Sequence, residues 1–383
     1  MNKYLFSIAL ISLALTSCDK DEEPVANPDG SFPDPIELSG TMSVSRTLTN
    51  HVADPSVPDY CISGDYFVEA NLTVEPGVYI QMKNDSRIRV RNSGTFYCVG
   101  TSNDKITISG ENSIDAGQWE NIHFSTPSSA NQLVHTDISG GGNSSTYDGM
   151  VFIGYQGRAL IQDCFLSFSS TNGIKTESTG SILGGISDCI ISLCALYPIE
   201  VNARQVPAIA TSNTGAGNGH DQINVREVQL QNPATWDNTY FPYHINGNLS
   251  VNTDWTVEPG VTFVFAQGAQ IDIFSGGSMN CIGTASDNIR FIGETSTAGS
   301  WDGVTFISST NPLNHFEYCN FLNGGGHQNY EGMITLWTNA EARVGNCSFT
   351  NSASWGILVS SSSTLNDDGN NTFNGNAFGS INP

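Results

Sequence analysis

Asn71-Leu72-Thr73-Val74-Glu75-Pro76-Gly77-Val78 recurs further along the chain as Asp254-Trp255-Thr256-Val257-Glu258-Pro259-Gly260-Val261. The offset between these two stretches, to within one residue, also aligns further landmarks in the two halves. A single offset that holds over so many positions predicts an internal duplication. We place the first copy of this unit of about 183 residues at 38–220 and the second at 221–383. The aligned landmarks are Tyr60/Tyr243, Cys98/Cys281, Trp119/Trp301, Gly149/Gly332, Cys164/Cys347 and Gly173/Gly356.

Short strands separated by turn residues make up the local pattern of both copies. Ile106-Thr107-Ile108 and Ile271-Asp272-Ile273 alternate apolar and polar residues with a period of two, which is typical of strands. Such runs are bounded by Gly, Asn, Ser and Asp. The Asp-Cys pair at Cys164 returns at Cys189. The pattern predicts an all-β chain of stacked coils with about 25 residues in each.

Three further motifs carry a resemblance to a known fold. They are the Glu75-Pro76-Gly77 turn, the Gly-Thr pair after a strand, and the segments Gly117–Phe124 and Gly299–Phe306. With them the chain, from about residue 38 to its end, resembles the right-handed parallel β-helix superfamily and the β-helix regions of Bacteroidota surface proteins. The resemblance implies a solenoid of about 14 coils, each pairing with the coils above and below. Two β-sandwiches remain the alternative; they would show hairpin turns.

The N-terminus resembles a bacterial lipoprotein signal. Residues 1–17 contain a basic start and an apolar run, and Cys18 follows small residues at the place where such proteins receive a lipid. Residues 18–37 are acidic and rich in Pro, which predicts an extended tether after the lipidated Cys18. The resemblance implies an outer-membrane lipoprotein, anchored by its lipid, that faces the outside of the cell. The alternatives are an ordinary secretory signal and a plain solvated spacer.

The charge balance narrows the range of partners. The chain has 14 Lys and Arg against 37 Asp and Glu, a net charge of −23. A surface of this sign repels phosphate, so we expect no nucleic-acid partner. Nine cysteines occur without a C-x-x-C motif, and those after Cys18 lie in apolar, strand-like contexts. We interpret these eight as buried thiols, although cysteines on adjacent coils would also lie within disulfide reach.

A basic row is the best candidate for ligand binding. Arg87, Arg89 and Arg91 alternate with apolar residues, so the three guanidinium groups are expected on one outward face, close to Lys83. Such a row could bind an acidic polysaccharide, since Arg matches carboxylate and sulfate groups in bidentate fashion. The alternative is a solvated strand face paired with neighbouring acids such as Asp85. The second copy has Gln270, Asp272 and Phe274 at the corresponding positions.

Other candidates are weaker. Trp236 and Tyr240, with Phe241 and Tyr243, form an aromatic group that could stack on a sugar or seal the junction of the copies. Asp367 and Asp368, before Gly369, offer oxygen ligands for Ca²⁺, but the loop lacks the spacing of an EF-hand.

No residue pattern in the chain indicates a defined catalytic site. His135 and Asp137 could share one face, but the sequence shows no nucleophile elbow, P-loop or metal-binding helix. We therefore expect a non-catalytic module that binds extracellular glycan or another surface partner, with no cofactor beyond Ca²⁺. The alternatives are a lyase or hydrolase that acts on acidic polysaccharide, with the basic row stabilising the reacting uronate, and a structural spacer.

Overall fold

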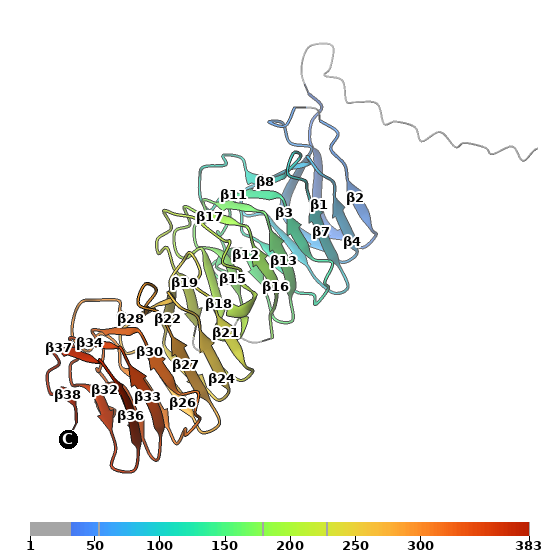
Figure 1. Cartoon of the computed structure of the whole chain (residues 1–383). Coiled ribbons are helices and arrows are strands. Elements are labelled where there is room, and N and C mark those ends of the chain that lie inside the picture. Colours follow the sequence, from blue (N-terminus) through green and yellow to red (C-terminus); the bar gives the residue numbers. More distant parts are fainter. Residues whose placement is uncertain (1–31, 53, 178–179, 227–228, 383) are drawn as a thin grey trace, which may run out of the picture.

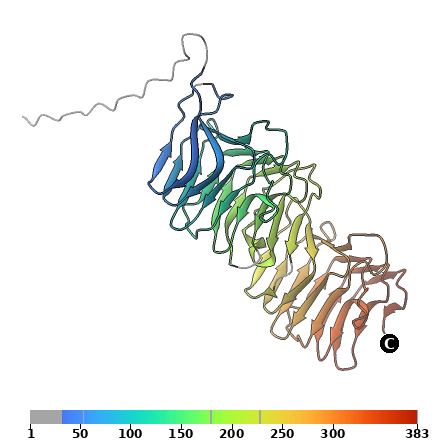
Figure 2. The ribbon, with the colours of Figure 1, turned by 180° about the vertical axis from the view of Figure 1, so that it is seen from behind.

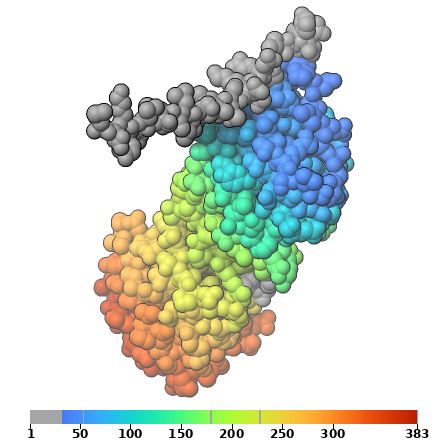
Figure 3. Space-filling view, turned by 90° about the vertical axis from the view of Figure 1, so that its right-hand side faces the viewer, coloured from blue at the N-terminus to red at the C-terminus, as the bar shows by residue number. Residues whose placement is uncertain are grey.

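The computed structural model describes residues 32–52, 54–177, 180–226 and 229–382. These residues form an elongated β-solenoid of about 14 coils (Figures 1 and 2). The strands of successive coils pair in parallel. This pairing confirms the predicted parallel β-helix and excludes two β-sandwiches, which are antiparallel. The space-filling view shows the coils following one another along one body from blue to red (Figure 3).

One face of the solenoid runs from the first coil to the last, and we call it the long sheet. Each of its strands pairs with the strand of the next coil. Its strands are β1 (Ile36–Met42), β3 (Tyr60–Val68), β6 (Arg87–Val90), β9 (Ile122–Phe124), β12 (Gly149–Ile153), β15 (Asn172–Thr176), β18 (Ile199–Asn202), β19 (Ile223–Arg226), β22 (Tyr243–Asn246), β25 (Thr262–Phe265), β28 (Ile289–Gly293), β31 (Cys319–Leu322), β34 (Ser348–Thr350) and β37 (Thr372–Asn374).

The other two faces each consist of one sheet in the N-terminal half and another in the C-terminal half. The N-terminal sheets contain β2 (Arg46–Leu48), β4 (Asn71–Val74), β7 (Thr95–Val99), β10 (Gln132–Val134), β13 (Arg158–Gln162) and β16 (Ile182–Ser187) on one face, and β5 (Tyr79–Met82), β8 (Ile106–Gly110), β11 (Thr136–Ser139), β14 (Phe165–Ser167) and β17 (Ile190–Ser192) on the other. The second group joins the long sheet through β3, which pairs with both β5 and β6.

The C-terminal sheets have the same arrangement. One contains β20 (Gln229–Leu230), β23 (Asn248–Val251), β26 (Gln270–Phe274), β29 (Gly303–Ile307), β32 (Gly332–Trp337), β35 (Trp355–Val359) and β38 (Gly379–Ile381). The other contains β21 (Ala234–Trp236), β24 (Asp254–Val257), β27 (Ser278–Ile282), β30 (His315–Glu317), β33 (Glu341–Gly345) and β36 (Thr364–Gly369).

The long sheet alone carries regular strand pairing through the middle of the chain. There, the coil after β18 contains a 3-10 helix, η1 (Ala203–Ala208), and two isolated bridges, Ile186–Ile209 and Ile190–Thr214. The long sheet continues past this coil through β18, β19 and β22. The predicted boundary at 220/221 therefore lies within one continuous solenoid, as expected for a second copy that extends the first.

Matching stretches of the two halves lie on different faces. The offset of the repeated sequence carries β4 onto β24 and β6 onto β26, yet β6 belongs to the long sheet and β26 does not. From β6 the long sheet advances seven coils to β25, and β26 is one strand further. The offset thus spans seven coils and one strand, which turns each matched position by one face of the solenoid. The duplication itself stays a prediction from the sequence.

Stacked apolar side chains fill the interior. In the long sheet most inward positions of the N-terminal half are Ile or Val, with Phe124 among the exceptions, whereas Phe is the commonest inward residue of the C-terminal half. Phe263, Phe291, Phe321, Phe349 and Phe373 form a ladder whose successive ring centroids are 5.2, 4.5, 4.9 and 5.0 Å apart. These rings stack because parallel pairing places identical residues about 4.8 Å above each other.

The shared Trp positions have matching structural roles. Trp119 and Trp301 are completely buried, and their indole N–H groups donate to Ser139 O and Leu322 O, each at 2.9 Å. A glycine loop passes over each indole: a Cβ on Gly141 would lie 2.7 Å from Trp119. This close approach requires glycine at one position of each triple-glycine stretch, Gly141 in the first half and Gly324 in the second. The eight described cysteines are buried and free, which confirms the interpretation as thiols.

The predicted lipoprotein features lie mostly outside the described residues. These features are the signal at 1–17, the lipidation site Cys18 and all but the last residues of the tether at 18–37. Strand β1 begins at Ile36, just before the predicted start of the first copy. Within the part of the chain that the structure describes, no helix has the length and apolar character needed to cross a membrane.

Candidate ligand-binding site

The basic row consists of Lys83, Arg87, Arg89 and Arg91; Arg87 and Arg89 lie on the outside of the long sheet, Lys83 lies in the turn between β5 and β6, and Arg91 directly follows β6. Arg87 and Arg89 belong to β6, and the intervening Ile88 and Val90 are completely buried. The predicted alternation is therefore confirmed. Lys83 precedes β6 and Arg91 follows it, so the row spans the full width of the strand.

Three of the four cations are neutralised by carboxylates. The partners come from neighbouring coils and include none of the acids closest in sequence, such as Asp85. For Lys83, Arg87 and Arg91, the structure therefore agrees with the alternative to ligand binding, a strand face whose cations are paired with neighbouring acids. The pairs are Lys83 Nζ–Glu111 (2.6 Å), Arg87 Nε–Asp65 (2.6 Å), Arg87 Nη1–Glu120 (3.0 Å) and Arg91 Nε–Glu69 (2.7 Å). The Arg91 guanidinium also lies over the ring of Phe67, 3.7 Å from its centroid.

Arg89 is the exception in the row. Among the described residues, its guanidinium group has no carboxylate within 4 Å and makes no hydrogen bond, and its Nε is buried without a partner. The guanidinium carbon lies 5.9 Å from the ring centroid of Tyr147, which comes from the loop between β11 and β12. Arg89 therefore combines a half-buried cation with unused donors.

His123 lies beside Arg89 on the next coil and is electrically neutral. The two residues are register partners in β6 and β9, and His123 is only 3% exposed. Burial, with smaller contributions from the positive charges of Arg89 and Arg87, lowers the pKa of His123 to about 3. Its Nε2 lies 2.9 Å from Ser125 Oγ, and its Nδ1 has no partner among the described atoms. At neutral pH this imidazole adds polarity to the site without adding charge.

Neither His123 nor Lys83 is suited to remove a proton from a substrate. A general base works best with a pKa near the working pH, and the pKa of His123 is far below it. The hydrogen bond from Lys83 to Glu111 raises the pKa of the Lys83 ammonium group, which stays protonated. The basic row therefore offers contacts for an anion but no evident base for lyase chemistry.

The structure separates the two predicted aromatic residues. Trp236 is completely buried and packs against Trp255, Tyr243 and Phe263 at centroid distances of 4.8 to 5.9 Å. In this position it seals the interior, in line with the alternative interpretation, and cannot stack on a ligand. Tyr240 is 57% exposed and borders a hollow of about 130 Å³.

The two predicted Ca²⁺ ligands already have protein partners. Asp367 Oδ1 accepts hydrogen bonds from Gly369 N at 2.9 Å and Asn371 Nδ2 at 2.8 Å. Asp368 forms an ion pair with Arg343 at 3.0 Å. Among the described residues, no group of three or more His, Cys, Asp or Glu side chains is arranged to hold a metal ion.

His135 and Asp137 do not form a pair. Asp137 is bound to Lys105 at 3.0 Å, whereas His135 Nε2 lies 3.9 Å from Asp163. The geometry therefore gives no support to a catalytic dyad at this point of the surface.

A buried charge network that sequence reasoning missed lies on the outside of the long sheet at the middle of the chain. Glu200 Oε1 contacts Lys175 Nζ at 2.7 Å and Arg226 Nε at 3.2 Å. Its other oxygen accepts from Asn224 Nδ2 at 3.1 Å. These residues lie on the successive strands β15, β18 and β19 and are far apart in the sequence. Only the spacing of the coils could have indicated from the sequence that they are neighbours. Each charged side chain of the network has an oppositely charged partner, which indicates a structural role. Arg226 Nε makes no hydrogen bond within the described residues.

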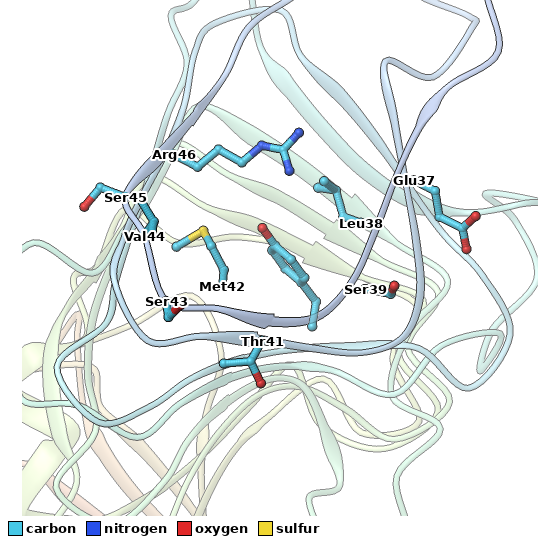
Figure 4. Close-up of a pocket in the computed structure, with 10 residues that line it drawn as sticks. Glu37, Leu38, Ser39, Thr41, Met42, Ser43, Val44, Ser45 and Arg46 are labelled. Atoms are coloured by element: carbon cyan, nitrogen blue, oxygen red, sulfur yellow. The ribbon is translucent and has the colours of Figure 1, made fainter.

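A hollow of about 510 Å³ lies at the open N-terminal end of the interior. Figure 4 shows Leu38 and Met42 directed into it and Arg46 extended across it. Its floor is the apolar core of the first coils, so the hollow follows from the end of the stack and gives no specific indication of a ligand.

Comparison of the chain with family models, with curated proteins and with solved structures finds no match. Inferences about function therefore rest on the geometry of the chain itself.

Proposed function

We propose that this protein is a lipid-anchored module of the outer bacterial surface, of the kind found in Bacteroidota, that binds an acidic extracellular glycan without turning it over. Arg89 is the principal anion contact. The lipid on Cys18 and the tether at 18–37 would hold the solenoid outside the membrane.

The observation that carries the proposal is the unpaired state of Arg89. Lys83, Arg87 and Arg91 are satisfied by carboxylates, but the donors of Arg89 have no acceptor among the described residues. A guanidinium group carries five N–H donors in a planar fork, which matches a uronate carboxylate or a sulfate. The anionic group of a ligand would supply the hydrogen-bond acceptors that Arg89 lacks within the protein. The Tyr147 ring beside Arg89 offers a surface for a sugar ring.

Binding without turnover is supported by the protonation states in the row. An elimination at a uronate needs a base near the α-proton, and the protonated Lys83 and weakly basic His123 do not provide one. The lyase and hydrolase alternatives therefore lack a specific supporting observation. The spacer alternative becomes the default if no glycan binds.

The test measures retention and product formation together. The full chain, in a detergent without a sugar headgroup, is incubated with polygalacturonate, chondroitin sulfate and neutral dextran. We expect an acidic polymer to be retained without appearance of unsaturated uronate or new reducing ends. Arg89→Gln should weaken retention about tenfold or more, as expected for loss of a charged hydrogen bond. Arg290→Gln, which removes an exposed cation on β28, is the matched control and should bind normally.

Formation of product by the unmodified chain would replace the binding proposal with an enzymatic one. Equal retention by the Arg89 and Arg290 variants would remove Arg89 from the site.

A further inference from the structure

The place in the second copy that corresponds to the basic row has the opposite charge character. At the offset of the repeated sequence Gln270 replaces Arg87 and Asp272 replaces Arg89, and Asp302 follows Trp301 as Glu120 follows Trp119. In the first copy Arg87 neutralises Glu120 at 3.0 Å. Within the described residues, Asp302 has no cationic group within 4 Å. Its carboxylate is therefore available to a ligand.

A cavity of about 340 Å³ opens at this carboxylate. It lies where the loop between β31 and β32 passes over the outer face of the sheet that contains β26, β29 and β32. Its lining is polar throughout and consists of Asp302, Gly326, His327, Gln328 and Asn329. A volume of this size falls at the lower end of ordinary small-ligand sites and suits a single sugar ring.

His327 lines this cavity, and backbone hydrogen bonds to its ring define which nitrogen can donate. Its Nδ1 accepts hydrogen bonds from the backbone N–H groups of Asn329 and Tyr330, both at 3.0 Å. An imidazole nitrogen that accepts cannot carry a proton, so Nε2 carries it and is a donor. No ion pair within 4 Å joins His327 to Asp302 or Asp272 in the described part of the chain, which leaves room for a ligand group between donor and acceptor.

Asp272 lies close enough to Asp302 for the charge of Asp302 to raise its pKa, and it carries an unused acceptor. The side chain belongs to a residue that is 8% exposed; Oδ2 accepts from Gln270 Nε2 at 2.7 Å, and Oδ1 is buried with no partner. A buried carboxylate oxygen without a donor is unfavourable. Burial also raises the pKa of both Asp272 and Asp302, and the charge of Asp302 raises that of Asp272 further. A ligand that donates a hydrogen bond to Asp272 Oδ1 would remove this unfavourable contribution.

Aromatic rings stand next to the cavity. The His327 ring stacks on Tyr330 at 4.7 Å, and Tyr330 meets Trp337 edge-on at 5.5 Å. Trp337, at the end of β32, is 38% exposed, whereas Trp119, Trp236, Trp255 and Trp301 are completely buried. An exposed indole beside polar groups is a surface on which a sugar ring can stack.

We propose that this cavity, which we call the Asp302 pocket, binds a neutral sugar residue through hydroxyl groups that accept from His327 Nε2 and donate to the carboxylate of Asp302. A hydroxyl group is the ligand group that both donates and accepts one hydrogen bond in this way. A metal ion is disfavoured, because the donor N–H of His327 opposes a cation and the described residues contain no metal-holding group. The site is independent of the acidic-glycan site at Arg89.

The test uses the full chain in a detergent without a sugar headgroup. The probes are the methyl glycosides of glucose, galactose, mannose, fucose, xylose and N-acetylglucosamine, with CaCl₂ and ethanolamine as competing chemistries. Saturation-transfer NMR detects binding, and titration of the Trp fluorescence gives the affinity. We expect at least one glycoside to bind, with an affinity that falls about tenfold or more in Asp302→Asn, the effect of losing a charged acceptor.

Controls separate this site from its surroundings and from the site at Arg89. Glu331→Gln removes one negative charge from the same loop but not from the pocket lining, and should bind the glycoside normally. His327→Gln, which keeps an N–H donor, should bind more strongly than His327→Phe. Arg89→Gln should leave glycoside binding intact, and Asp302→Asn should leave retention of acidic polymer intact.

Two results would overturn the proposal. One is the result that none of the glycosides tested gives a saturation-transfer signal that is lost in Asp302→Asn. The other is binding of Ca²⁺ or ethanolamine, but of no glycoside, with loss in Asp302→Asn, which would make the pocket a cation site.

Discussion

Arg89 on β6 and Asp272 on β26 occupy matching positions of the repeated sequence but lie on different faces of the solenoid. The offset between them spans seven coils and one strand, so the second position is turned by one face relative to the first. The chain thus places a cationic side chain on one face and a buried carboxyl group on another; Tyr147 lies beside Arg89, and His327, which stacks on Tyr330, lies close enough to Asp272 to affect its pKa. Two ligands of different charge could therefore be held without mutual obstruction.

The cysteines should be inert in the native protein. All eight described thiols are buried, and burial raises the pKa of Cys98 and of Cys194 to about 12. A hydrogen bond with Cys164 lowers the pKa of Cys189, so burial alone protects that thiol. Since the thiolate is the reactive form, an aromatic disulfide reagent at pH 8 should label none of them in the native chain and all eight after unfolding in urea. Rapid labelling of one or more native thiols would show that a coil opens locally.

Trp236 and Tyr240 should respond very differently to truncation. Trp236→Ala removes a fully buried indole that packs on Trp255, so we expect a loss of about 3–5 kcal/mol in the free energy of unfolding. Tyr240→Ala changes an exposed side chain and should stay within about 0.5 kcal/mol of the parent. Urea denaturation followed by circular dichroism measures both. Similar losses for the two variants would be inconsistent with this placement.

Glu200 should stabilise the middle of the solenoid. Glu200→Gln leaves Lys175 and Arg226 without their shared buried carboxylate, which should destabilise the fold by about 3 kcal/mol. Glu111→Gln breaks the exposed pair with Lys83 and should cost about 1 kcal/mol or less. Thermal denaturation at neutral pH compares the two variants. If the Glu111 variant melts as early as the Glu200 variant, burial does not set the strength of these pairs.

His123 should make the protein sensitive to acid. Unfolded, its imidazole takes up a proton near pH 6.5, but in the folded chain burial lowers its pKa to about 3. The unfolded state therefore binds more protons between these values. The contribution of neutral His123 to stability is complete above pH 6.5 and is lost as the pH falls toward 3, by up to about 1.4 kcal/mol per pH unit.

His123→Gln isolates this effect. The difference in melting temperature between the parent and the variant should shift in favour of the variant as the pH falls from 7 to 4. The pKa values of Asp272 and Asp302 are raised, so these two groups increase the stability as the pH falls. They do so equally in the parent and in the variant and therefore cancel in the difference. A difference that does not change with pH would mean that the pKa of His123 is the same in the folded and the unfolded chain.

Much of the fold followed from local pattern. Alternation with a period of two in Arg87–Val90 fixes which side chains point inward, whatever the rest of the chain does. The Gly260 turn, where φ is +83°, marks a corner of the coil because the left-handed backbone conformation favours glycine. The candidate site was predicted only in part: the row at Arg89 was found, whereas the pocket at Asp302 and the network at Glu200 were not.

The sequence by itself therefore determined the parallel solenoid, the buried thiols and the outward direction of the basic row, because these depend on the order of apolar and polar residues along a few positions. Only the tertiary structure decided that Arg87 meets Glu120 while Arg89 meets no acid, that Trp236 is inside, and that His327 faces Asp302 across a cavity. Such contacts join side chains a whole coil or more apart in the sequence. The physical reason is that the register between coils, and not the distance along the chain, determines which side chains become neighbours.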